Sequence, residues 1–82
     1  MREQILQLLR QRPFQPFRLY LSSGIVHEIR HPELALVSPT YIYVGVPAKD
    51  APGPAISEGF IVSLLHIVQV EPLASAGSPT AN

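Results

Sequence analysis

The sequence lacks cysteine and carries little charge. Without cysteine it can form no disulfide framework, thiolate metal site or cysteine nucleophile, so the fold must be held together by packing alone. Six basic residues balance six acidic ones, and charged residues make up only 15% of the chain. Charge therefore points to no nucleic acid, anionic membrane or acidic partner.

Long hydrophobic runs are also lacking. No apolar run approaches the roughly 18 residues that a membrane-spanning helix requires. The apolar stretch at residues 5–9 is short and interrupted by Gln7, which is unlike a secretory signal. We therefore expect a cytoplasmic location and no membrane partner. With 82 residues, the chain is expected to form one small domain over residues 1–72.

Hydrophobic residues nevertheless make up 46% of the chain, and those near the start recur at helical spacing. They predict an amphipathic helix over residues 2–11, which Pro13 ends. Residues 12–18 then repeat a Pro-Phe pair and predict an extended strap. Phe14 and Phe17 are expected in the core, and the alternative is a proline-rich ligand for an aromatic groove.

From Phe17 onward apolar residues alternate with polar ones, which is typical of strands with one buried face. Residues 22–24 are turn formers and predict a β-hairpin, with Gly24 supplying a positive φ. The apolar segment 60–70 is too long for one usual strand, so we expect it to bend near residues 64–66. The strands are expected at 17–21, 25–30, 34–37 and 41–46, with two more inside 58–71.

Two segments are expected to be irregular. Residues 47–57 contain three prolines and predict a mobile loop. Residues 73–82 are small and polar, with one leucine and no charge, and predict a disordered tail.

One helix followed by five or six short strands predicts a mainly β fold, either a small antiparallel barrel or a strongly curled sheet. The order resembles the Sm-like and SH3-like small barrels, in which a helix precedes five strands and a glycine separates the first two. Residues 17–24 and 64–70 carry this resemblance. The patterns RPFQPFR (12–18), HPE (31–33) and LLHI (64–67) also resemble a group of short uncharacterised bacterial proteins, over residues 1–72. That resemblance implies no activity.

Nucleic-acid binding is one functional hypothesis. Residues 1–18 carry a net charge of +3 and residues 19–82 a net charge of −3. Phosphate contacts and base stacking would come from arginines and tyrosines, namely Arg10, Arg12, Arg18, Arg30, Tyr20, Tyr41 and Tyr43. Sm-like RNA binders, however, carry Asp and Asn in one loop and a polar Arg-Gly type of turn in another. Here the first of these places holds Ala35 and Ser38-Pro39, and the second holds Leu65-His66. The alternative is that the arginines line a solvated helix face and strap.

The histidines and serines form no recognisable metal or catalytic motif. His27 and His31 would lie about 13 Å apart on an extended strand, too far to share an ion with bonds of about 2 Å. His66 would have to come from another strand. No serine has a nucleophile-elbow or triad context, and the glycines are scattered. We expect no enzyme, metal, cofactor or small-molecule substrate. A hydrolase that uses His31 or His66 is the remaining enzymatic alternative.

The leading hypothesis follows from the amount of apolar surface. A domain of this size buries only about 60% of the surface of its unfolded chain, and Ile25, Val26 and residues 61–70 place apolar side chains on both strand faces. Edge strands that pair between copies would bury this surface, so we expect a homo-oligomer, either a two-fold dimer or a ring. The expected function is that of a non-enzymatic small-barrel module that self-assembles or binds a partner. The rival is that the helix covers the second apolar face within one chain.

Overall fold

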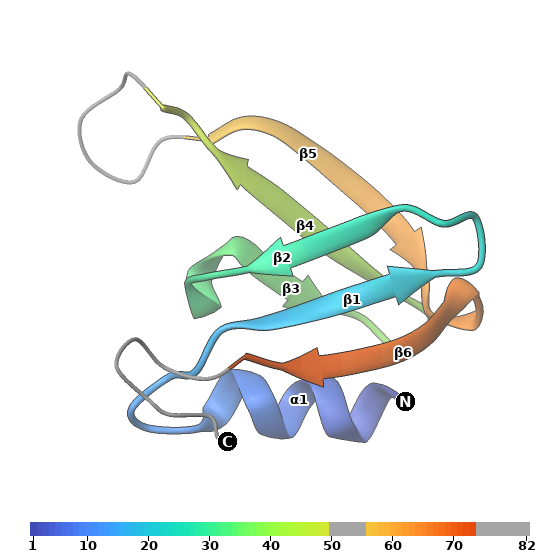
Figure 1. Cartoon of the computed structure of the whole chain (residues 1–82), viewed down its shortest axis with the longest axis horizontal. Helices are drawn as coiled ribbons and strands as arrows, with labels where there is room; N and C mark the ends of the chain where they lie inside the picture. The colour runs from blue at the N-terminus through green and yellow to red at the C-terminus, as the bar shows by residue number, and fades with distance from the viewer. Residues whose placement is uncertain (50–55, 74–82) are drawn as a thin grey trace.

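The computed structural model describes residues 1–49 and 56–73. Within them, one N-terminal helix accompanies two three-stranded antiparallel sheets of order β2-β1-β6 and β3-β4-β5 (Figure 1). This confirms the predicted mainly β fold with one helix. The elements in chain order are α1 (Arg2–Arg10), β1 (Phe17–Leu21), β2 (Val26–Ile29), η1 (Pro32–Leu34), β3 (Ala35–Val37), β4 (Tyr41–Pro47), β5 (Ile56–Ser63), η2 (Leu64–His66) and β6 (Ile67–Pro72).

The sheets do not close into a barrel among the described residues. The first and last strands, β1 and β6, pair with each other, but no strand pairing joins one sheet to the other. The chain changes sheet at two corners, each formed by a short 3-10 turn, η1 and η2. The corner at η2 confirms the predicted bend of the apolar segment, because bends are how strands pass between packed sheets.

The core lies between the two sheets and reaches the helix. Alternation along each strand directs one set of side chains inward, as the sequence pattern predicts for β1. The buried side chains come from the helix and from both sheets: Ile5, Phe17, Leu19, Ile29, Ala35, Ile42, Val44, Val62 and Ile67.

Helix α1 lies alongside β6 and covers one side of the core (Figure 1). Ile5 is fully buried, and Nε of Arg2 donates to the carbonyl of Ser38 over 3.2 Å. The strap that follows is fixed to the core, because the rings of Phe14 and Phe17 pack edge to face with centroids 6.1 Å apart. The helix is one residue shorter than predicted, and none of the described helices is long and apolar enough to span a membrane.

The turn between β1 and β2 and the start of β5 can be compared with the predicted turn and loop. Gly24 has a φ of 95° in the turn between β1 and β2, as the turn residues predict. Strand β5 begins at Ile56, earlier than predicted, and pairs with β4 as far as Pro47. Residues 50–55 of the expected mobile loop and 74–82 of the expected tail lie outside the described residues.

Candidate functional site

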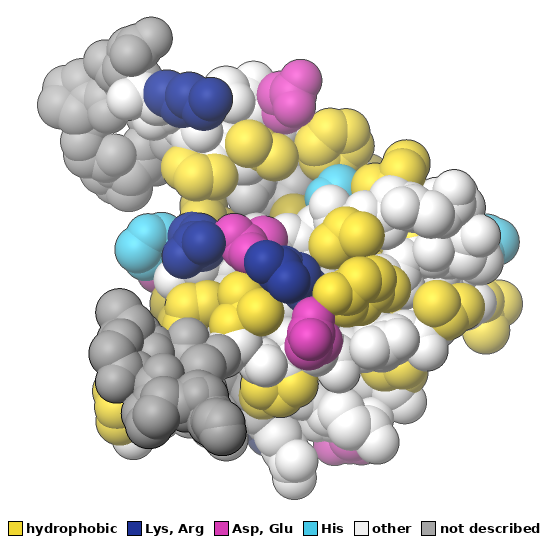
Figure 2. All heavy atoms as spheres, viewed as in Figure 1, with side chains coloured by type: hydrophobic (Ala, Val, Ile, Leu, Met, Phe, Trp, Pro, Cys, Tyr) yellow, Lys and Arg dark blue, Asp and Glu magenta, His cyan; other side chains and the backbone are white. Residues whose placement is uncertain are grey.

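The outer face of the sheet β2-β1-β6 carries an ion-pair network, here called the charged face. Cross-strand register places Arg18 of β1 opposite Glu28 of β2 and Glu71 of β6. Nε of Arg18 lies 3.1 Å from Oε2 of Glu28, and its Nη1 lies 3.7 Å from Oε1 of Glu71. Nε of Arg30 lies 2.8 Å from the other oxygen of Glu28. Figure 2 shows these basic and acidic side chains gathered over β1 and its neighbours.

The basic and acidic side chains of the charged face neutralise one another. Tyr20 Oη donates to Oε1 of Glu71 over 2.5 Å, so the tyrosine is tied into the same network. Hydrogen bonding with Tyr20 and then with Glu28 raises the pKa of Arg18. Arg18 and Arg30 therefore face two carboxylates, and a phosphate would have to displace these partners to bind.

The other predicted nucleic-acid contacts lie elsewhere. Arg10 is exposed in the last turn of α1. Nη1 of Arg12 donates to the carbonyls of Leu9 and Gln11, over 3.2 and 2.8 Å, at the helix end where a cation is favourable. Tyr41 and Tyr43 lie on β4, in the other sheet. The structure thus divides the predicted residues among three places.

The outer face of the sheet β3-β4-β5 has a different character. Register aligns Leu36, Tyr43 and Ile61 in one row across the three strands, with Tyr41 beside them. Leu36 is 66%, Ile61 72% and Tyr41 42% exposed. This uncharged face, defined by these four residues, contrasts with the charged face because no acidic or basic side chain interrupts the row.

Gly59 of β5 lets the ring of Tyr43 lie across the strand. A Cβ at position 59 would collide with Oη, Cζ and Cε1 of the Tyr43 ring. The pairing register does not place Gly59 directly opposite Tyr43, since its partner is Gly45. The phenol therefore reaches along the sheet toward the free side of β5, which adds aromatic surface there.

Strand β5 is the exposed border of this sheet. Its first six residues, from Ile56 to Ile61, are exposed, and only Val62 is buried. One side of β5 pairs with β4, and its other side has no partner strand among residues 1–49 and 56–73. Sequence reasoning missed Ile56 and Ser57 as strand, because it assigned both residues to the proline-rich loop 47–57.

A groove of about 440 Å³ separates β5 from strand β2 and from the turn between β1 and β2. The imidazole of His27 lies in it with its centroid 5.1 Å from that of Phe60, and burial lowers the pKa of His27. At one end, Oγ of Ser22 lies 3.4 Å from Nδ1 of His66. Among the residues that the structure describes, no carboxylate lines this groove to orient His66 as the base of a catalytic triad.

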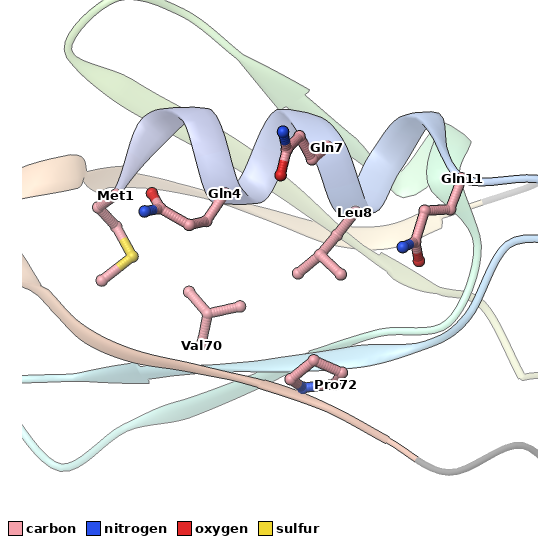
Figure 3. A pocket seen from close by; sticks show the side chains of 7 residues that line it. All are labelled: Met1, Gln4, Gln7, Leu8, Gln11, Val70 and Pro72. Atoms are coloured by element: carbon pink, nitrogen blue, oxygen red, sulfur yellow. The ribbon is translucent and has the colours of Figure 1, made fainter.

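A second groove, of about 400 Å³, lies between α1 and β6 (Figure 3). Leu8 of the helix points toward Val70 of the strand, and the polar groups of the lining are the amides of Gln4, Gln7 and Gln11. Within residues 1–49 and 56–73, no ionisable side chain lines this groove. Among the described residues, no group of three His, Cys, Asp or Glu side chains could hold a metal ion.

No protein-family model, curated protein or solved structure significantly matches the chain. The comparisons therefore neither support nor contradict the resemblance to the short bacterial proteins.

The structure brings together residues whose contact could not be predicted from the sequence. Ser22 and His66 are 44 positions apart and meet only because β1 pairs with β6. The two outer faces likewise depend on register between strands. His31, in contrast, is exposed just before η1, away from His27 on β2 and from Ser22.

Proposed function

We propose that the protein is a non-enzymatic β module that self-associates through the free edge of β5. The observation that carries this proposal is the exposure of an eight-residue strand with unpaired backbone groups and apolar side chains at the border of the uncharged face. Such an edge is a template for another strand. Ile56, Phe60 and Ile61 are 46%, 40% and 72% exposed along it.

The free energy gained by burying the exposed apolar side chains of β5 is consistent with association. Fully burying a large apolar side chain contributes about 1.5 to 3 kcal/mol. Contributions from three partly exposed side chains in each of two copies, together with strand pairing, reach the scale of the association cost of about 4 to 15 kcal/mol. A reversible assembly is the expected result.

The two sheets also fit the proposal that the fold is an opened small barrel of the Sm-like or SH3-like kind. The pairing of the first strand, β1, with the last, β6, is what a barrel requires. The turns η1 and η2 stand where continuous strands would bend from one sheet to the other. An opened barrel keeps free edges, and these are what self-association uses.

Nucleic-acid binding is the weaker alternative. The arginines of the charged face are paired with Glu28 and Glu71, and the other two predicted phosphate contacts, Arg10 and Arg12, lie near the end of α1. We expect no mobility shift with single-stranded RNA or duplex DNA at low salt. A shift that weakens steeply as salt is raised would favour this alternative over self-association.

Sedimentation equilibrium over a wide range of protein concentrations tests self-association. The wild-type mass is expected to rise above that of one chain as concentration increases. Lysine is a natural protection of edge strands, so Ile61→Lys is expected to remain monomeric. Leu36→Lys is the matched control, since Leu36 is similarly exposed in the same row but lies on β3. A wild type that stays monomeric throughout would overturn the proposal.

A further inference from the structure

The groove between the β1–β2 hairpin and the second half of β5 lies at the end of the molecule where η2 turns the chain (Figure 1). Its volume of about 440 Å³ is typical of small-molecule sites, which range from about 300 to 1,000 Å³. We infer that this groove binds a small uncharged aromatic molecule that carries a hydrogen-bonding oxygen. The inference goes beyond the proposed self-association and does not depend on it.

The groove has an apolar floor and an apolar rim. Among its lining residues, Val62 is buried and Leu21 is half-buried against the core, so these two side chains form the floor. Ile25 and Ile61 line the same groove and are 54% and 72% exposed, so they form the rim. A ligand seated on the floor would cover apolar surface that water contacts in the free protein, which favours binding.

The ring of Phe60 gives the groove an aromatic wall. Its centroid lies 5.1 Å from that of the His27 imidazole, and the two planes are tilted by 42°. This contact holds the ring from one side, while Phe60 as a whole remains 40% exposed. Aromatic rings pack favourably on one another in offset or edge-to-face arrangements. A planar aromatic ligand therefore suits this wall better than a saturated molecule of the same size.

The lining carries no charge that could balance an ionised ligand. Within the described part of the chain, no lysine, arginine, aspartate or glutamate lines the groove. His27 is neutral at pH 7, because burial lowers the pKa of its imidazole below the ordinary value of 6.5. Burying an ionised group beside apolar side chains without a charged partner is unfavourable. These features select an uncharged ligand.

Hydroxyl groups gather at the end of the groove nearest η2. Oγ of Ser22 lies 3.4 Å from Nδ1 of His66. Oγ of Ser23 and Oγ of Ser63 each accept a hydrogen bond from the backbone N–H two residues further on, over 3.4 and 3.3 Å. Accepting these bonds leaves both hydroxyl hydrogens able to donate. A ligand oxygen at this end would accept from them, while the ring of the ligand lies toward Phe60.

Backbone hydrogen bonds fix the position of these hydroxyl groups. Leu21 N donates to the carbonyl of Ile25 over 2.9 Å, and Gly24 N donates to that of Leu21 over 2.9 Å, which closes the hairpin turn. Ser22 N donates to the carbonyl of His66 over 2.8 Å and so joins the hairpin to η2. A site held in this way loses little conformational freedom when a ligand binds. The groove is therefore formed before the ligand arrives.

Titration of the isotope-labelled protein with 2-naphthol, followed by NMR at a protein concentration where single chains predominate, tests this inference. Saturable shifts are expected for the amides of Ser22, Phe60 and Ile61, with a Kd of about 1 mM or lower. The amides of Gln4 and Val70, beside the other groove, should not shift. The saturated counterpart decahydro-2-naphthol and the ionised 2-naphthoate should each bind at least about tenfold more weakly.

Three variants locate the ligand. Phe60→Ala removes the aromatic wall and should weaken the binding of 2-naphthol by at least about tenfold. Tyr41→Ala is the matched control and should leave binding unchanged, because Tyr41 is 42% exposed in the same sheet but does not line the groove. Ser22→Ala changes an exposed turn residue outside the core, so it should fold and should weaken binding by about three- to tenfold.

The contrary outcomes are distinct from those of the proposed function. An absence of saturable shifts, or shifts centred on the groove beside α1, would overturn the inference. Equal affinity for 2-naphthoate or for the saturated counterpart would overturn the ligand class. Unchanged binding by both Ser22→Ala and a folded Phe60→Ala would place the ligand elsewhere. A monomeric wild type that binds 2-naphthol removes the proposed function and keeps this inference, and an associating wild type that does not bind it does the reverse.

Discussion

Gly59 leaves room for the ring of Tyr43, which approaches the backbone of β5 closely at this position. In a strand, glycine is normally less favourable than alanine by roughly 0.5 to 1 kcal/mol. Here the Tyr43 ring occupies the space of the missing Cβ. The steric conflict should outweigh the gain in strand preference, because displacing the ring gives up its packing across β5.

We predict that Gly59→Ala lowers the free energy of unfolding by about 1 to 3 kcal/mol, as measured by urea denaturation. In a Tyr43→Ser background, which removes the ring, the same change should be neutral or stabilising. An equal loss in both backgrounds would show that Tyr43 is not the cause.

His27 supplies a second prediction at this scale. Burial disfavours its charged form and lowers its pKa below the ordinary value of 6.5. The unfolded chain therefore takes up the proton first, so stability falls as pH decreases from 6.5 through the folded pKa, and this contribution is constant above 6.5. His27→Gln should flatten the dependence of unfolding free energy on pH between about 5 and 7. Measurements in the Ile61→Lys background keep association out of the comparison, and an unchanged slope would contradict the assignment to His27.

At the scale of elements, α1 is the part whose stability depends most on its neighbours. A helix of nine residues is marginal in water by itself, and its stability comes from docking an apolar face. Ile5 provides that contact, since it is fully buried among side chains of both sheets. The rival interpretation was that the helix covers the second apolar face within one chain, and Leu36 and Ile61 nevertheless remain exposed.

Ile5→Ala should lower the free energy of unfolding by about 2 to 5 kcal/mol, through lost burial and the cavity left behind. Gln7→Ala, on the exposed side of the same helix, should change it by less than about 0.5 kcal/mol. Urea denaturation of the two variants checks this. Similar losses in both would mean that helix propensity, and not docking, stabilises α1.

At the scale of the whole molecule, the two outer faces behave differently toward solvent. The charged face neutralises its own charges, whereas the uncharged face and the edge of β5 offer apolar surface and backbone groups. Self-association through β5 therefore involves little net charge. Its dependence on salt should be weak, in contrast to binding that releases counterions from nucleic acid.

We predict that the dimer dissociation constant changes by less than about threefold between 0.05 and 0.5 M sodium chloride, measured by sedimentation. A contact made by many phosphates or ion pairs would weaken by orders of magnitude over this range. Strong weakening would show that the charged face, and not β5, makes the contact.

The contact between Arg18 and Glu71 shows what sequence reasoning could not predict at a site. Arg18 belongs to the positively charged segment 1–18, but register places Glu28 and Glu71 beside it, and Glu28 also lies beside Arg30. Glu71 is far from Arg18 in sequence, and only the pairing of β1 with β6 brings them together. The uncharged face was missed for the same reason, since the row from Leu36 to Ile61 exists only across three strands.

The sequence by itself determined the helix, the hairpin at Gly24 and the bend before β6, because these depend on side-chain spacing and on glycine and proline within a few residues. Only the tertiary structure decided that two open sheets form, that β5 starts at Ile56 and that its edge is free. Those features depend on backbone hydrogen bonds between distant strands, and local preferences do not specify which strands pair.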